Sequence, residues 1–227
     1  MSKAYFHKKN CLLLISLLIL GLAFPGFSMM IGNTTGRGFD EPITGSGALS
    51  KASGTYETVE GLVIQGATYF LKGKASVYSL SSQLEASDLE GIFYSDYQLS
   101  VDEALSYFRI AQSYYKALKN KADNTPYNQE VIDKLRAFDY DSFSKNYGLN
   151  IDIFNQVKSF LEAGDIRGVY ARFLEYTENI IGILEVVQTD LYKWNFPKVE
   201  TIWNLNQECA NMLLFGQYVA RVFYKIP

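Results

Sequence analysis

The sequence predicts an all-α protein, organised as an antiparallel helical bundle of four longer helices plus shorter crossing helices, behind a flexible N-terminal segment. Two observations predict this class. Apolar side chains recur every three or four residues over most of the chain after residue 57, which is the period of amphipathic helices. Aromatic residues make up 15% of the chain while only 5 residues are proline, a composition typical of a packed globule. We therefore expect one helical bundle domain over residues 57–227.

The first 28 residues have the three parts of a secretory signal. Lys3, Lys8 and Lys9 precede an apolar run over residues 11–24, and Pro25-Gly26 ends that run. Small residues at Gly26 and Ser28 then provide a cleavage site. The sequence predicts a signal peptide over residues 1–28, with cleavage after Ser28 or a few residues later.

An uncleaved membrane anchor is the alternative for this segment. If residues 27–31 are counted, the apolar stretch approaches the roughly twenty residues that span a bilayer. The lysines would then keep the N-terminus inside and send the remaining chain outside. Both interpretations predict an exported domain, periplasmic or extracellular in the first case and membrane-anchored in the second.

Residues 29–56 are rich in glycine, serine and threonine. This composition predicts a flexible segment. The glycines lack the GxxxxGK[ST] spacing of a phosphate-binding loop. We expect no ligand there.

Residues 57–85 are the most ambiguous part of the predicted domain. A helical face is formed by Val63, Ala67, Phe70, Val77 and Leu84. Glycines interrupt this face, and a hairpin turning at Lys72-Gly73 is the alternative. We favour a helix because clear helical patterns dominate the remaining chain.

Capping signals predict three helices in the middle of the chain. Ser100 and Glu103 have the spacing of a capping box, which would open a helix over residues 100–121. Thr125-Pro126 has the order of an N-cap and a first-turn proline, and the apolar pattern then continues to Phe138. Asn150 is expected to cap a third helix that ends at Gly164.

Two long helices are predicted to complete the chain. Asp165 is expected to cap a helix to about Trp194, and Pro197 to start the last one. The inward stripe of the last helix is expected to include Trp203, Met212, Leu213, Val219, Ala220 and Phe223. Because the connection at Asn195-Phe196 is short, we expect these two helices to pack as an antiparallel hairpin.

Histidine and cysteine usage excludes several classes of site. His7 and Cys11 both lie in the predicted signal, so the mature chain keeps only Cys209 and no histidine. A zinc site with histidine ligands, a histidine-assisted nucleophile, a histidine-bound haem and a Glu-x-x-His di-iron site all require an imidazole. Cys209 lies in an apolar pattern and is expected to be buried, with an intermolecular disulfide as the alternative. We expect no metal, no cofactor and no enzymatic activity.

The charge of the mature chain argues against nucleic acid as a partner. Removing residues 1–28 leaves 18 basic and 24 acidic side chains, a net charge of −6. Binding to nucleic acid or to anionic lipid requires clustered lysine and arginine, and the chain has no basic run. We expect membrane contact only through an uncleaved N-terminal segment.

Carboxylates are the remaining candidates for chemistry. Glu175, Glu178 and Glu185 fall opposite the apolar stripe of their predicted helix, where a solvated surface is expected. Asp96 and the Asp139-Tyr140-Asp141 stretch are expected in loops, without the spacing of a calcium-binding EF-hand. A histidine-free hydrolase built on these acids is therefore the least favoured class.

Two side-chain groups are candidates for recognition. The first is a set of tyrosines, because tyrosine is enriched at recognition surfaces. Its members are Tyr94, Tyr97, Tyr107, Tyr114, Tyr127, Tyr140 and Tyr147. The second is a possible polar pocket on the last helix, formed by Trp203, Asn204, Gln207 and Asn211. The structural alternatives are rings at the bundle edge with wet hydroxyls, and amides that fix helix register.

From these observations we expect an exported, non-enzymatic interaction protein, such as an adaptor or accessory subunit of a cell-envelope or extracellular assembly. Its partner would be another exported or envelope protein. The alternative is a helical bundle that binds a small ligand in an apolar cavity edged by amide side chains.

Overall fold

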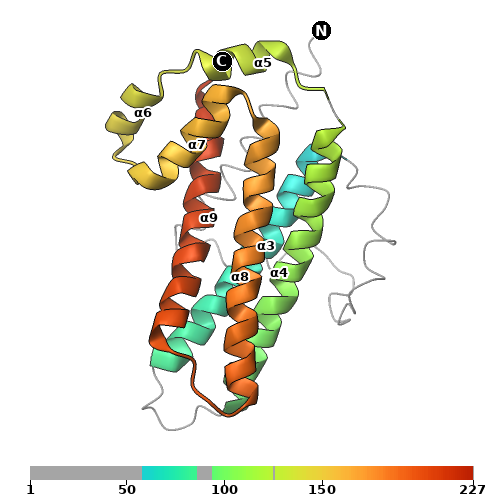
Figure 1. The fold of residues 1–227 in the computed structure, drawn as a ribbon, viewed down its shortest axis with the longest axis vertical. Coiled ribbons are helices and arrows are strands. Elements are labelled where there is room, and N and C mark those ends of the chain that lie inside the picture. The colour runs from blue at the N-terminus through green and yellow to red at the C-terminus, as the bar shows by residue number, and fades with distance from the viewer. Residues whose placement is uncertain (1–57, 86–93, 125, 227) are drawn as a thin grey trace, which may run out of the picture. The chain divides into compact units, whose positions relative to one another are not determined.

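A computed structural model describes residues 58–85, 94–124 and 126–226 of the protein (Figure 1). These residues form seven α-helices and no strand, which confirms the all-α class. The predicted signal over residues 1–28 and the predicted flexible segment over residues 29–56 lie outside the described residues. Within the described residues, no helix has the length and apolar character needed to cross a membrane.

Contacts within the described residues group the chain into two compact units. The first, here called the long-helix unit, comprises residues 61–126 and 165–212. The second, the short-helix unit, comprises residues 127–164 together with the chain from residue 213 onward. Each unit is described by itself.

The long-helix unit contains α3 (Val59–Glu85), α4 (Tyr94–Asp123), α8 (Ile166–Tyr192) and the first half of α9 (Val199–Lys225). Helices α4 and α8 lie side by side (Figure 1), and two side-chain contacts show that they run in opposite directions. At one end the rings of Tyr115 and Phe173 stack with centroids 5.6 Å apart. At the other end Gln98 Nε2 donates to the carbonyl oxygen of Leu191.

Residues 59–85 form the helix α3, so the favoured prediction is confirmed and the hairpin alternative is wrong. The glycines that made this segment ambiguous have a packing role. A Cβ atom added at Gly66 would lie 2.7 Å from Tyr115 Cε1, and one at Gly73 would lie 2.7 Å from Phe108 Cε2. Because glycine leaves that space empty, the aromatic rings of α4 pack directly on the α3 backbone.

The predicted start of α4 is wrong. The helix begins at Tyr94, so Ser100 lies inside it and is buried. The Ser100 hydroxyl donates to Gln83 Oε1, and Glu103 Oε2 accepts from the Ser76 hydroxyl. Both side chains therefore bind α3 rather than cap a helix, because tertiary partners are available on α3.

The short-helix unit contains α5 (Gln129–Arg136), α6 (Tyr140–Tyr147), α7 (Ile151–Ala163) and the last part of α9. The predicted start at Thr125-Pro126 is wrong, because Asn128 is the N-cap of α5 and its side chain accepts from the Glu130 amide. Thr125 itself lies outside the described residues. The expected extension of this helix to Phe138 is also wrong, since α5 ends at Arg136.

The expectation of a loop at residues 139–141 is wrong as well. Asp139 is the N-cap of α6, and its side chain accepts from the Ser142 amide. The predicted boundaries of α7 are confirmed. Asn150 caps it by accepting from the Ile153 amide, and Gly164 follows its end with a left-handed φ of 74°.

The boundaries of α8 and α9 differ slightly from those predicted. Asp165 caps α8 as expected, but the helix ends at Tyr192, because Trp194 adopts a left-handed φ of 61°. Helix α9 begins at Val199 rather than at Pro197. Trp203 was expected to face inward, but it is 62% exposed.

Candidate functional site

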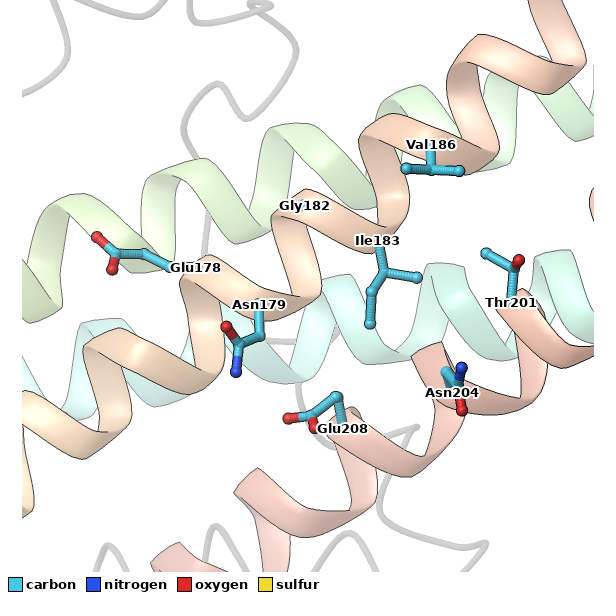
Figure 2. A pocket seen from close by; sticks show the side chains of 8 residues that line it. All are labelled: Glu178, Asn179, Gly182, Ile183, Val186, Thr201, Asn204 and Glu208. Carbon is cyan, nitrogen blue, oxygen red and sulfur yellow. The ribbon is translucent and has the colours of Figure 1, made fainter.

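An open groove runs between α8 and the first half of α9 in the long-helix unit (Figure 2). It has a volume of about 550 Å³ and is open to solvent rather than enclosed. We call it the α8–α9 groove. Its lining residues are Glu178, Asn179, Gly182, Ile183, Val186, Thr201, Asn204 and Glu208.

The spacing of the lining residues follows directly from helix geometry. On α8, four of them occur at positions i, i+3, i+4 and i+7, from Asn179 to Val186, and form one stripe. The neighbouring stripe contains Ile180, Leu184 and Val187, which are buried. Helix α8 therefore has a buried stripe in the core and a second stripe along the groove. Asn179 and Ile183 point from α8 toward α9 (Figure 2).

Gly182 lies in the middle of the α8 stripe and has no packing role. A Cβ atom added there would have no atom within 4 Å among those described. Its conformation is helical, so it has no need for a left-handed φ either. A glycine inside a helix costs about 1 kcal/mol relative to alanine. Its effect is to leave the α8 backbone uncovered on the wall of the groove.

Glu208 provides the least satisfied polar atom of the groove. Its Oε2 atom is buried and has no hydrogen-bond partner among the described residues. Burial raises the pKa of this carboxyl above its ordinary value, Arg172 partly opposes the shift, and Glu175 adds to it. The guanidinium of Arg172 pairs instead with Glu175, with Nη1 and Oε2 2.7 Å apart.

Glu178 lies at the edge of the groove. Its Oε1 atom accepts from Gln112 Nε2 on α4, 3.3 Å away. Glu185 is exposed and pairs with Arg109 at 3.0 Å. The three glutamates of α8 therefore lie on an exposed surface, as predicted, and Glu178 also borders the groove.

Aromatic side chains gather at the turn between α8 and α9. The ring of Trp194 lies 5.0 Å from that of Tyr94, and the ring of Phe196 lies 5.4 Å from it. Trp194 takes the left-handed position that ends a helix, where glycine is usual, and its amide donates to the Leu191 carbonyl. Glycine would adopt this backbone conformation with less strain. The Trp194 side chain is 72% exposed, so its large ring faces solvent.

The tyrosines predicted as a recognition surface fall into separate places. In the long-helix unit, Tyr94 and Tyr97 contact Phe196, while Tyr107 and Tyr114 contact Tyr69 on α3. Tyr97 is buried, so its ring contributes to packing.

In the short-helix unit, Tyr140 is buried and its hydroxyl donates to the Leu135 carbonyl oxygen at 2.9 Å. Tyr147 is exposed beside Phe143, with ring centroids 4.7 Å apart. Tyr127 is half-buried before α5. The seven tyrosines are thus divided between the two units, with two of them in the core.

Of the four residues predicted to form a pocket, Asn204 lines the α8–α9 groove. Gln207 is exposed and donates to Asn211 Oδ1, 2.9 Å away. Trp203 points to solvent. These three residues do not line the groove.

Two further features bear on chemistry. Cys209 is buried, and burial raises the pKa of its thiol to about 12. Among the described residues, no group of three histidine, cysteine, aspartate or glutamate side chains is placed to hold a metal ion.

Sequence reasoning missed most of the groove: Asn179, Gly182, Ile183, Val186, Thr201 and Glu208. The available signal was Gly182 in an otherwise regular helical pattern, with Asn179, Ile183 and Val186 at helical spacing around it. Comparison of the chain with family models, curated proteins and solved structures finds no match.

Proposed function

We propose that the protein is an exported, non-enzymatic interaction protein, such as an adaptor or accessory subunit of a cell-envelope or extracellular assembly. The observation that supports this proposal best is the open α8–α9 groove. Pockets for small ligands usually enclose most of the ligand surface, whereas an open groove along two helices suits a protein partner. Exposed Trp194 and Phe196 at the adjoining turn add contact area of the kind found at protein interfaces.

The proposed export rests on the basic, apolar and small-residue parts of the first 28 residues. N-terminal sequencing of the protein from the envelope or medium of its native host tests it. We expect a mature chain that begins at Met29 or a few residues later. A protein found only inside the cytoplasm would contradict the proposal.

Photo-crosslinking from the groove tests the interaction. A photoreactive amino acid at position 182 of the full-length protein, activated in the native host, is expected to form a specific adduct with another exported protein. The same residue at position 185, on the same helix but outside the groove, is the matched control. Absence of an adduct, or identical adducts from both positions, would count against the proposal.

Binding of a small ligand is the alternative. Ile183 and Val186 beside Asn204 support it, since apolar and amide side chains meet there. Native mass spectrometry of protein purified from its own host distinguishes the two, because a reproducible bound mass favours the small ligand.

A further inference from the structure

We propose that the α8–α9 groove binds an amphipathic α-helix of a partner protein, and that this helix places a lysine or arginine beside Glu208. The inference rests on the proposed interaction function and adds the chemistry of the partner. Four properties of the groove lead to it: the spacing of its walls, an uncovered backbone, an acidic lining without a basic residue, and two apolar side chains on the α8 wall.

The side chains on the two walls of the groove have the spacing needed to pack against a third helix. On α8 the stripe occupies positions i, i+3, i+4 and i+7, and on α9 Thr201, Asn204 and Glu208 follow at i, i+3 and i+7. Two parallel rows at helical spacing form a groove into which the side-chain ridge of another helix fits. An amphipathic helix in such a groove is a recurrent mode of protein recognition.

Gly182 allows that helix to approach closely. No atom lies within 4 Å of a Cβ built there, and the residue is exposed. Small residues at helix interfaces let two backbones come together, which extends contact along both helices. Within this protein, Gly66 and Gly73 of α3 each leave space that an aromatic ring of α4 fills.

The acidic side chains of the groove predict that the partner helix contributes a basic side chain. Glu208 Oε2 is buried without a hydrogen-bond partner among the described residues, and Glu178, which binds Gln112, adds a second carboxylate to the lining of the groove. None of the residues that line the groove is basic. Arg172, whose charge lowers the pKa of Glu208, pairs with Glu175. The Glu208 side chain is half-buried and lines the groove, so a change of rotamer would bring its carboxylate to a partner's ammonium or guanidinium and form a charge-assisted hydrogen bond.

At the opposite end of the groove, the α8 wall is apolar and faces Thr201 and Asn204 of α9 (Figure 2). Ile183 and Val186 line it, and Val186 is 53% exposed. Asn179 and Val186 are seven residues apart on α8, which corresponds to roughly 10 Å along a helix axis. The partner helix is therefore expected to carry its basic residue and its apolar anchor about two turns apart.

Other occupants fit less well. A second copy of the chain docked through the same groove would bring further carboxylates toward Glu208. A small alkylamine would satisfy Glu208 but leave the rest of a groove built on two helical stripes unfilled. The experiment below detects a second copy as a concentration-dependent dimer, and that outcome would overturn the proposal.

The test uses the exported form of the protein, labelled with ¹⁵N, and two synthetic amphipathic helices of about eighteen residues. One carries lysine and leucine seven positions apart, and the other has glutamate in place of lysine. We expect the lysine peptide to shift the amide signals of Asn179, Gly182, Ile183 and Glu208. The glutamate peptide should bind at least about tenfold more weakly, because it removes the charge-assisted contact.

Three variants test which residues of the groove are responsible for peptide binding. Glu208→Gln should reduce the preference for the lysine peptide to less than about threefold, whereas Glu185→Gln, a matched loss of one carboxylate outside the groove, should preserve it. Gly182→Leu should abolish binding of both peptides by filling the groove. Circular dichroism and thermal unfolding of each variant verify that it is folded.

Several outcomes would overturn the inference: no binding of the lysine peptide, equal binding of both peptides, shifts confined to another surface, or a concentration-dependent dimer that Gly182→Leu disrupts. If the peptides fail while position 182 still crosslinks to an exported protein, the proposed function stands and only the basic-helix inference falls. If position 182 captures nothing, the proposed function fails independently.

Discussion

At the scale of single residues, the protonation of Glu208 changes the stability of the fold. Burial raises its pKa above the ordinary value of 4.5, so the folded state binds the proton more tightly than the unfolded state. The carboxylate therefore destabilises the fold at neutral pH, and this penalty disappears as the pH falls below 4.5. The neighbouring charges of Arg172 and Glu175 are the same in the substituted protein.

Glu208→Gln is accordingly expected to increase the free energy of unfolding at pH 7 by about 1 kcal/mol, because glutamine removes the desolvated negative charge and keeps a side chain of the same size. The gain should shrink toward zero near pH 4. Urea unfolding at the two pH values measures it, with Glu185→Gln as the control. A variant that is less stable at pH 7 would contradict this assignment.

The burial of Cys209 leads to a second prediction at the scale of single residues. Its side chain is buried and its thiol pKa is raised to about 12, so the reactive thiolate is scarce at pH 8. Iodoacetamide should leave the native protein unmodified at this position and modify it fully in urea, as followed by mass spectrometry. Rapid modification of the native protein would show that α9 opens locally.

At the scale of the helices, two glycines offer a matched comparison. Gly73→Ala places a Cβ 2.7 Å from the buried ring of Phe108, whereas Gly182→Ala places one in open space. Alanine gains about 1 kcal/mol of helix propensity at either position. Overpacking against Phe108 is expected to cost about 2 kcal/mol or more.

We therefore expect Gly73→Ala to lower the free energy of unfolding by about 1 kcal/mol or more, and Gly182→Ala to raise it by about 1 kcal/mol. Chemical denaturation monitored by circular dichroism measures both. Equal effects of the two substitutions would mean that Phe108 moves aside at little cost.

Helix boundaries were predictable where the deciding contacts are local. Asn150, Gly164 and Asp165 act within three residues of their own positions, so their chemistry is visible in the sequence. Ser100 has the same local signal, yet its hydroxyl binds Gln83 on another helix. Such a partner is invisible until the fold is known. Gly66 and Gly73 made the helix prediction ambiguous for the same reason, because the rings that fill the space beside them belong to α4.

At the scale of the whole molecule, the two tryptophans of the sequence give an unusual optical property. Trp194 is 72% and Trp203 62% exposed. We expect the native protein to emit at nearly the wavelength of indole in water, with little shift on unfolding. Fluorescence spectra in buffer and in urea test this. A native spectrum shifted clearly to the blue would indicate that a partner or a second copy covers these rings.

The candidate groove was predictable only in part, because it exists only where α8 and α9 lie together. The sequence predicted a polar pocket that includes Asn204 on the last helix; in the structure Asn204 lines the groove, and its neighbours across the groove belong to α8. The pattern of α8 indicated an apolar stripe and an exposed face; Gly182, with Asn179, Ile183 and Val186 at helical spacing around it, was the one local signal, and it did not identify α9 as the facing helix. Glu208 shows the same limit, since its buried oxygen depends on packing rather than on local sequence.

The burial of Cys209 has a practical consequence for studying this protein. In the predicted mature chain it is the only native cysteine, and it is shielded from reagents. A cysteine introduced at position 182 would then be the single reactive thiol without removal of any native residue. Spin labels or fluorophores attached there would report directly on what enters the groove.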